Sequence, residues 1–498
     1  ICFEIKYLPK TDTDDIAISL ISGRKPVLLL HDNGKALLHE NALLREHHVN
    51  VWQTLRMEAN FSTGKALVKL NGKKCCELPL ADGAKKADGI RLSYTAPNGG
   101  ILKFTDIFVF EMQPEPADYV PEPILPKKKD YYVGMNICSL WRNGGHWGWD
   151  VISPYHENKT YMGYYDEGLP EVADWEIKWM AEHGLDFELY CWYNSQVNAP
   201  ICTTGLSAAI HGGHFNAKYG DYMKFALLWE AMNCAHPSVE AFRKHIVPYW
   251  MDYFFSDPRY FTIDNKVLIA VFGSGNLIKD FGSVEAVKEQ LDYVREEVKK
   301  LGFDGAIFLS CGGPTEAVRD CGFDGVYAYN WGTQGFDPDY TKAQITSQRE
   351  KKLVHVVPTV STGFNNIAWA YTRYPLITTE NMEQVLTWVR DSALNKYEIT
   401  GNGDEWKKKF VMLFTWNEYG EGTYMMPAGL NGFGYLDTVR KVFTKGTNHT
   451  DEQPNTLQMA RLGHMYPINR EIIRPQGYYE APEASTVIYE EKFAENGK

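Results

Sequence analysis

The amino-acid sequence predicts an α/β protein in which a (β/α)8 TIM barrel follows a smaller antiparallel β-sandwich of jelly-roll type. Three observations lead to this prediction. Short alternating strand-like runs fill residues 1–112, proline is concentrated in residues 113–130, and apolar runs alternate with helical segments through residues 131–445. Residues 446–498 are left as a C-terminal extension. With 498 residues, the chain can hold about two to four domains that each bury a core.

The first 112 residues show the two-residue alternation of strands that bury one face. Turn signals such as Asn71-Gly72 and Asn98-Gly99-Gly100 separate the runs. A W-x-x-L-x-M strand, a V-K-L-N-G strand and a final F-T-D-I-F-V-F strand follow in an order that resembles concanavalin- and laminin-G-like sandwiches. Residues 487–493 alternate similarly and could return to complete the sandwich. The predicted strands are 2–8, 16–22, 49–61, 66–72, 90–94 and 101–112.

Residues 113–130 are expected to form a linker between the two domains. Five prolines precede three consecutive lysines in this stretch, and proline removes the N–H group that a central strand would donate. The lysine triplet at 127–129 is short, so it is interpreted as a solvated segment.

The barrel prediction depends on eight apolar runs with helical segments between them. Such alternation requires crossover connections, which join parallel strands. The joint Gly184-Leu185-Asp186 recurs as Gly302-Phe303-Asp304 and Gly322-Phe323-Asp324, and we interpret these helix-to-strand joints as structural. The eight predicted strands are 132–141, 185–193, 225–230, 266–273, 306–311, 325–331, 354–361 and 410–418.

Composition and charge exclude several classes of function. A formal net charge of -12 opposes binding to phosphate backbones and anionic membranes, so no nucleic-acid partner is expected. No window approaches 18 uninterrupted apolar residues, so membrane insertion is not expected. The nine cysteines form no C-x-x-C pair and are interpreted as free thiols. No Cys–His zinc site is predicted, and no metal or cofactor is assigned, with Ca²⁺ binding left open.

Aromatic residues gather where the predicted barrel strands end. Thirteen of the 14 tryptophans fall between Trp141 and Trp416. Flat rings stack on sugar faces, whereas a phosphate ligand would call for basic residues or a glycine-rich loop. The alternative is that these rings only pack helices against the barrel; their recurrence at strand ends favours a ligand groove. The candidate substrate-binding residues are Trp141, Trp192, Tyr193, Trp229, Glu230, Tyr329, Asn330, Trp331, Trp416 and Asn417.

The segment FTWNEYGEGTYMMP, residues 414–427, contains the candidate catalytic residues. Glu418 and Glu421 follow the last predicted strand in a glycine-containing loop. Cleavage of a glycosidic bond needs a carboxylic acid that protonates the leaving oxygen and a carboxylate that acts as base or nucleophile. Two nearby carboxyl groups in unequal environments can divide these roles. Glu230, after the third strand, is a spare candidate carboxylate, or else a hydrogen-bonded residue of the barrel mouth.

Two sequence blocks resemble a known enzyme family. The string W-N-E-Y-G-E-G-T resembles the N-E-W-x-E-G signature of glycoside hydrolase family 99, the endo-α-mannosidases, and of the related WbsX-type family. The blocks at 162–172 and 180–193 are similar to the WbsX-type pattern in order and spacing. The resemblance implies a retaining glycosidase in which Glu418 deprotonates the sugar 2-hydroxyl to give a 1,2-anhydro intermediate. It also implies that Glu421 acts first as acid and then as base.

Tyr419 and Gly420 depart from family 99, which usually carries Trp and His between the two glutamates. Mannose specificity is therefore not carried over, and the division of roles between the glutamates stays open. The function predicted is a retaining glycoside hydrolase acting on a polysaccharide or complex glycan. The alternatives are a non-catalytic glycan-binding protein and a WbsX-type glycosyltransferase, although no D-x-D motif with a basic cradle is visible.

The chain begins with Ile1, which indicates a processed or trimmed product. We expect a bacterial protein that is secreted, periplasmic or attached to the cell surface, and a monomer whose partner is its glycan substrate.

Overall fold

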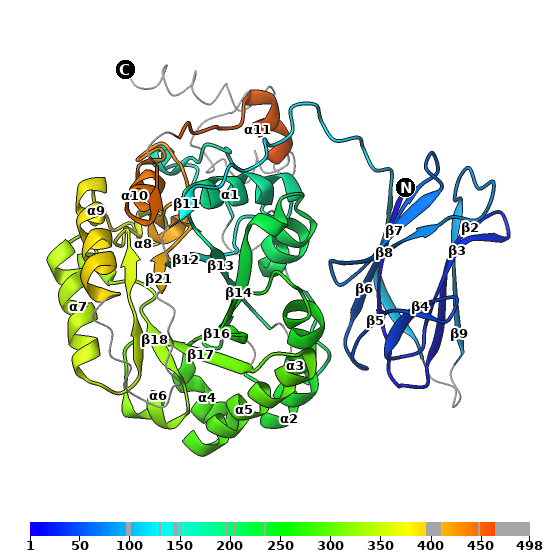
Figure 1. The fold of residues 1–498 in the computed structure, drawn as a ribbon, viewed down its shortest axis with the longest axis horizontal. Coiled ribbons are helices and arrows are strands. Elements are labelled where there is room, and N and C mark those ends of the chain that lie inside the picture. The colour runs from blue at the N-terminus through cyan, green and yellow to red at the C-terminus, as the bar shows by residue number, and fades with distance from the viewer. Residues whose placement is uncertain are drawn as a thin grey trace.

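A computed structural model describes residues 1–463 except 96–100, 129–130, 143–147, 150, 195–197, 204, 234–235, 395–409 and 447–448. Residues 464–498 lie outside the described part, and with them the predicted returning strand at 487–493. Figure 1 shows a sandwich of strands beside a barrel that is surrounded by helices. These two parts confirm the predicted fold class, an α/β barrel with antiparallel sheets at its N-terminus.

The N-terminal part consists of two five-stranded antiparallel sheets. The first sheet has the order β10-β1-β6-β7-β8 and the second has the order β5-β4-β3-β2-β9. One apolar cluster contains residues of both sheets, such as Phe3 and Ile18, so the sheets bury their inner faces against each other. The strands are β1 Cys2–Leu8, β2 Asp15–Ser22, β3 Lys25–Asp32, β4 Ala36–His39, β5 Ala42–Glu46, β6 Gln53–Asn60, β7 Lys65–Leu70, β8 Lys73–Pro79, β9 Gly89–Thr95 and β10 Lys103–Phe110.

Strands β3, β4, β5 and β8 were not among those predicted. The predicted turn before β8 is present. Asn71 and Gly72 both adopt the positive φ (53° and 77°) that a tight hairpin turn requires. The strand after this turn was missed because it reads KKCCELP, with a poor alternation of apolar and polar residues. Its side chains are accordingly mostly half-buried or exposed.

The barrel is a parallel sheet with the order β19-β18-β17-β16-β14-β13-β12-β21-β20. The short strands β19 and β20 flank Pro358, which cannot donate a ladder hydrogen bond. One half pairs with β18 and the other half pairs with β21, so this single run closes the ring. The strands are β12 Tyr132–Ile137, β13 Phe187–Trp192, β14 Lys224–Glu230, β16 Lys266–Phe272, β17 Gly305–Cys311, β18 Gly325–Tyr327, β19 His355–Val357, β20 Thr359–Ser361 and β21 Phe410–Phe414.

Helices surround this ring in Figure 1. The helical segment over 239–255 alternates α-helical pieces with π-helical turns, and Pro248 lies within it. The α-helices are α1 Pro170–Glu182, α2 Val239–Ala241, α3 Val247–Trp250, α4 Ser274–Phe281, α5 Val284–Glu297, α6 Glu316–Asp320, α7 Pro338–Glu350, α8 Ile367–Ala370, α9 Thr379–Trp388, α10 Gly434–Phe443 and α11 Thr456–Leu462.

Short strands complete the described elements: β11 Lys127–Lys128, β15 Thr262–Ile263, β22 Asn417–Glu418, β23 Thr423–Tyr424 and β24 Thr444–Lys445. Strand β11 pairs with β24, so the end of the proline-rich segment is bound to the segment after α10. No described helix has the length and apolar character needed to cross a membrane.

The repeated Gly-x-Asp joints have the structural role that was predicted. Gly184 and Gly322 adopt positive φ (85° and 82°) after the preceding helices. The Asp186 carboxylate accepts a hydrogen bond from the backbone N–H of Val133 (2.7 Å), and Asp324 accepts one from Phe308 (2.7 Å). Each aspartate thus ties the start of its strand to a neighbouring strand, at the end of the barrel opposite the strand C-termini.

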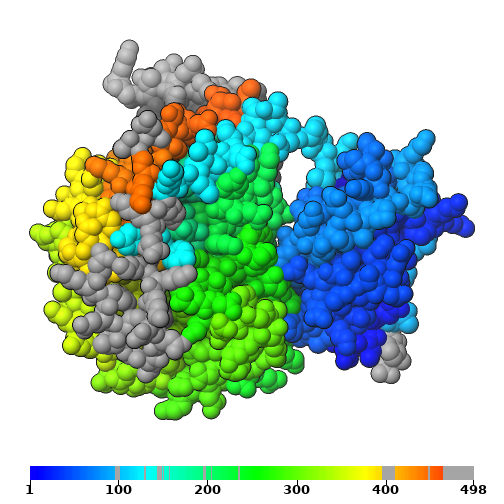
Figure 2. Space-filling model, viewed as in Figure 1, coloured from blue at the N-terminus to red at the C-terminus, as the bar shows by residue number. Residues whose placement is uncertain are grey.

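The sandwich packs on the barrel through a buried carboxylate. Asp252 accepts hydrogen bonds from the backbone N–H (2.9 Å) and Nδ1 (2.6 Å) of His48, and from Nε2 of Gln53 (3.0 Å). The Lys73 ammonium donates to the backbone carbonyls of Asp252 and Tyr253. Figure 2 shows the two parts in direct contact. A polar network of this kind fixes the relative position of two surfaces, because each partner left alone would be buried without a hydrogen bond.

We predict that Asp252→Ala lowers the free energy of unfolding by about 3 kcal/mol, because it leaves buried donors without an acceptor. The matched control is Asp292→Ala, which removes surface pairs with Lys288 and Arg295 (both 2.7 Å) and should cost about 1 kcal/mol or less. Burial opposes the charged form of His48, but its hydrogen bond with Asp252 raises the His48 pKa overall.

The stabilisation that comes from this raised pKa is therefore complete below the unfolded value and is lost as the pH rises through the folded value. Urea denaturation at acidic and alkaline pH measures both effects. Equal losses in the two variants would contradict this account of the interface.

Candidate active site

The segment that carries the two candidate catalytic glutamates forms a tight hairpin at the C-terminal end of β21. Strand β22 pairs with β23, and the 3-10 turn Tyr419–Glu421 joins them. Gly422 ends that turn in the left-handed conformation (φ 62°). In a barrel of parallel strands, this end is where the loops that carry ligand-binding and catalytic residues gather.

Tyr419, between the two glutamates, anchors this hairpin in the protein core. Its ring is fully buried and lies edge-on to Trp141 (4.8 Å between ring centroids) and tilted against Trp149 (5.3 Å). Its hydroxyl lies 3.4 Å from the hydroxyl of Tyr165 and 2.6 Å from Sδ of Met426. This aromatic packing fixes the backbone from which both carboxyl groups project.

Gly420 is required by the close approach of an indole ring. A Cβ atom at this position would lie 1.8 Å from Cε2 of Trp369, so no other residue fits without displacing that ring. Trp369 belongs to α8, which follows strand β20 at the same end of the barrel. The indole of Trp369 thus occupies the space that a side chain at position 420 would need.

The Glu418 carboxyl group is buried and hydrogen-bonded. It is 6 % exposed, and Oε2 accepts a hydrogen bond from the Tyr329 hydroxyl (3.0 Å). Its backbone N–H donates to Oγ1 of Thr415 (3.1 Å). Burial, and after it the charge of Glu421, raises the pKa of Glu418 well above its ordinary value, although the hydrogen bond from Tyr329 opposes the rise.

The Glu421 side chain is half-buried. Burial raises its pKa from 4.5 to about 7. Its Oε2 is buried and has no hydrogen-bond partner among the described residues, while its backbone carbonyl accepts from the N–H of Asn365 (2.7 Å). The charge of Glu421 also contributes to the raised pKa of Glu418, so the protonation of one group affects that of the other.

Asn417 presents one free donor beside this pair. Its Oδ1 accepts from the backbone N–H of Cys138 (2.8 Å), and its backbone carbonyl accepts from Nε1 of Trp141 (2.6 Å). Its Nδ2 is buried without a hydrogen-bond partner in the described part of the chain. A buried amide N–H left in this state is suited to donate to a bound hydroxyl group or water.

The predicted aromatic residues divide between the two sides of the barrel wall. Trp192 contacts Trp250 and Phe254, Trp229 stacks on Phe242 (5.5 Å between ring centroids), and Nε1 of Trp416 donates to Oε1 of Glu176 (2.9 Å). All three indoles are at most 1 % exposed. They pack strands against helices, which is the alternative role that the sequence left open for Trp192, Trp229 and Trp416.

Two further tryptophans also serve packing. Trp141 is completely buried behind Tyr419. Trp331 is 9 % exposed, and its Nε1 donates to the backbone carbonyl of Thr359 (2.9 Å). The packing alternative therefore applies to Trp141 as well.

Tyr193 and Tyr329 lie close to the carboxyl pair. Burial, followed by the charges of Cys191, Cys138 and Glu418, raises the pKa of the Tyr193 phenol. Tyr329 packs on Phe414 (3.9 Å between ring centroids) and donates to Glu418. These two half-buried rings are the predicted aromatics that the structure brings to the site.

Glu230 and Asn330 are occupied by turns of their own loops. The Glu230 carboxylate accepts from the backbone N–H groups of Met232 (3.2 Å) and Asn233 (2.9 Å), and also from the Asn233 side chain. Oδ1 of Asn330 accepts from the N–H of Gly332 (2.9 Å). The local hydrogen-bonding role considered for Glu230 is the one that the structure shows.

Sequence reasoning missed Trp369, Trp149 and Tyr165. Trp369 belongs to α8, in the connection after β20, and no motif in the sequence marks it. Trp149 and Tyr165 come from the long connection after β12, where Trp149 donates through Nε1 to the backbone carbonyl of Tyr165 (2.7 Å). The one signal that points to Trp369 is its position in the connection after a strand, at the end of the barrel where such connections carry the site.

Comparisons with known proteins yield one family model and several solved structures. Residues 231–439 match the model described as "Glycosyltransferase WbsX", and this segment includes Glu418 and Glu421. No curated protein matches the sequence. Among solved structures, the chain is similar to the GH99 endo-α-mannosidase from Bacteroides thetaiotaomicron in complex with bis-tris propane. The identity is 14%, the match covers 69% of this chain and 98% of that chain, and the TM-score is 0.42.

A second structure of the same Bacteroides thetaiotaomicron enzyme matches with 14% identity, covering 63% of this chain and 84% of that chain, at a TM-score of 0.38. The N-terminal modules of the Clostridium thermocellum endo-1,4-β-D-xylanase 10B match with 10% identity. That match covers 89% of this chain and 85% of that chain, at a TM-score of 0.36.

We predict that Tyr419→Ala destabilises the protein by about 3–5 kcal/mol, because it empties a ring-sized volume in a packed core. Tyr419→Phe keeps the ring and loses only the hydroxyl contacts, so it should cost about 1 kcal/mol. Chemical denaturation of both variants measures the difference. If the two substitutions had the same effect, the ring would not be the anchor of the hairpin.

Proposed function

We propose that the protein is a retaining glycoside hydrolase that acts on a polysaccharide or complex glycan, with Glu418 and Glu421 as its acid–base pair. The observation that carries the proposal is the placement of two glutamates on one hairpin at the C-terminal end of the barrel strands, where burial raises the pKa of both. The match of this region to the WbsX family model supports chemistry on glycans.

The protonation of the pair suits hydrolysis of a glycosidic bond. One member must hold a proton for the leaving oxygen while the other accepts one. Because burial raises the pKa of Glu421 to about 7, Glu421 holds a proton in a substantial fraction of molecules near neutral pH. Two independent surface glutamates would both be ionised there and could not supply the acid.

We assign the roles by the neighbours of each group. The Tyr329 hydroxyl donates to Glu418, and such a hydrogen bond stabilises a carboxylate, so Glu418 is the proposed base. Glu421, with an oxygen that has no partner among the described residues, is the proposed acid. Asn417 Nδ2 is free to bind a substrate hydroxyl between them.

The proposed reaction has two steps. Glu418 takes the proton of the sugar 2-hydroxyl, O2 attacks C1, the bond from C1 to the leaving oxygen breaks, and that oxygen takes the proton of Glu421. Glu421 then takes a proton from water, whose oxygen attacks C1 and opens the 1,2-anhydro ring, while O2 recovers its proton from Glu418. Two inversions at C1 give net retention, and both glutamates return to their starting states.

The family model also names a second candidate function. Because the matched family is described as a glycosyltransferase, the same pair could serve transfer of a sugar to an acceptor other than water. Supplying sugar nucleotides and polysaccharides in parallel separates the two activities, since only a transferase consumes the nucleotide sugar. Binding to glycans without turnover of either substrate would favour a binding protein.

We predict that Glu418→Gln and Glu421→Gln each lower the release of reducing ends from an active polysaccharide by about 10²–10⁴-fold. The control is Glu230→Gln, a buried carboxyl at the same end of the barrel whose hydrogen bonds stay within its own loop; it should retain activity within a few-fold. A dinitrophenyl glycoside, whose leaving group needs no protonation, should restore release of the phenol in the first step to the Glu421 variant alone. Wild-type activity in both glutamine variants would refute the proposal.

A further inference from the structure

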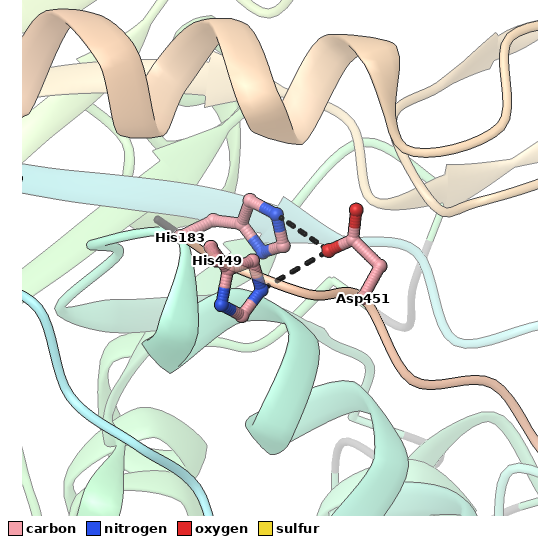
Figure 3. Close-up of side chains that lie close together, drawn as sticks. All are labelled: His183, His449 and Asp451. Atoms are coloured by element: carbon pink, nitrogen blue, oxygen red, sulfur yellow. Dashed lines mark ion pairs between the residues drawn. The ribbon is translucent and has the colours of Figure 1, made fainter. Parts of the chain in front are cut away.

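Three side chains of the kinds that bind metal ions, His183, His449 and Asp451, lie close together (Figure 3). His183 is the residue that ends α1, and it precedes β13, so it lies near the N-terminal ends of the strands. His449 and Asp451 belong to the segment between β24 and α11. Glu418 follows the C-terminal end of β21, and the parallel strands therefore separate the two sites.

The three side chains point their ligand atoms at one another. Nε2 of His183 lies 3.2 Å from Oδ1 of Asp451, and Nε2 of His449 lies 3.0 Å from the same oxygen. All three ligand atoms lie within 4.8 Å of one another. Around a tetrahedral Zn²⁺ with bonds near 2.0–2.1 Å, neighbouring ligand atoms are about 3.3 Å apart. The two separations from Asp451 already approach this value.

The orientation of His183 is fixed by its other ring nitrogen. Nδ1 lies 2.6 Å from the backbone carbonyl of Trp179, and because a carbonyl only accepts, Nδ1 must carry the hydrogen. A neutral His183 therefore directs the lone pair of Nε2 into the cluster, which is the arrangement that a metal-bound histidine usually has. The side chain is completely buried, and Nε2 makes no well-formed hydrogen bond in the described part of the chain.

Two further carboxylates lie close to these histidines. Oδ1 of Asp437 lies 3.6 Å from Nε2 of His183, and Oε2 of Glu182 lies 3.8 Å from Nε2 of His449. Lys178 is bound to the other oxygen of Glu182 (2.7 Å) and to Glu452 (2.9 Å). Two imidazole nitrogens together with carboxylate oxygens form a ligand set that suits Zn²⁺ better than the all-oxygen sets of Ca²⁺ and Mg²⁺.

We propose that His183, His449 and Asp451 bind a structural Zn²⁺ ion, with Asp437 or water in the fourth position. The ion would join the segment after β24 to α1, where Nε1 of Trp179 already donates to the backbone carbonyl of Glu452 (2.7 Å). The sequence offered no sign of this site, because its ligands come from distant parts of the chain. The proposal does not depend on the proposed glycosidase activity.

The test uses the full chain without a purification tag, freed of metal by a chelator and then titrated with ZnCl₂ in a calorimeter. We expect one Zn²⁺ per chain and a Tm that rises by several degrees, with no comparable rise for CaCl₂ or MgCl₂. Absence of a stoichiometric Zn²⁺ site in the wild type would overturn the proposal, and the side chains would then form a hydrogen-bonded ion-pair cluster only.

Variants locate the ion within the chain. His449→Gln and Asp451→Asn should each lower Zn²⁺ affinity by more than about 100-fold, since loss of a direct ligand exceeds the effect of losing its supporting contacts. These positions are partly exposed, so their variants should fold even where a substitution of buried His183 does not. His236→Ala, at an exposed histidine paired with Asp280 (3.0 Å), is the control and should bind as the wild type does. Wild-type affinity in both ligand variants would also overturn the proposal.

Discussion

The candidate site depends on the burial of two neighbouring carboxyl groups on one short hairpin. A glutamate alone in a loop would stay hydrated and ionised, but Tyr419 is packed among Trp141, Trp149 and Tyr165 and holds the hairpin against the core. Burial then raises the pKa of both Glu418 and Glu421. The raised pKa values lower the free energy of unfolding as the pH rises from the glutamate pKa of the unfolded chain toward that of the folded chain. In this range the unfolded chain releases protons that the folded chain retains.

Packing explains most of the unusual tryptophan content. Along each barrel strand, successive side chains alternate between the interior and the helices. Trp192 and Trp229 face the helices. The residue after each points elsewhere: Tyr193 lies near the carboxyl pair, and Glu230 is hydrogen-bonded within the loop that follows it. These tryptophans thus pack between the strands and the helices, and the tyrosines and smaller polar groups face the barrel interior.

The sequence predicted the barrel well because its signals are local and redundant. Each apolar run is long enough to mark a strand, and glycines such as Gly184 mark the joints. Of the site, the sequence predicted Glu418, Glu421 and Tyr329, because all three lie at strand ends. The sequence-based prediction did not separate the side chains that face the barrel interior from those that face the helices. Because side chains alternate along a strand, only one member of each strand-end pair can face the interior.

Contacts between distant segments could not be predicted. Nothing near Gly420 in the sequence indicates that Trp369 fills its side-chain space, and nothing near His183 indicates that His449 and Asp451 face it. The strand β8 escaped for another reason, since a half-exposed strand leaves a weak alternation pattern. Such features follow from the folded arrangement, which no local pattern contains.

The central claim is that burial keeps a proton on the carboxyl pair at neutral pH. Carbon-13 NMR of protein labelled at the glutamate carboxyl carbon measures this directly, with Glu421→Gln used to assign the resonance. We predict a glutamate signal that titrates near pH 7 in the wild type and is absent from the variant. If the resonance lost in the variant instead titrated near the ordinary value of 4.5, the central claim would be contradicted.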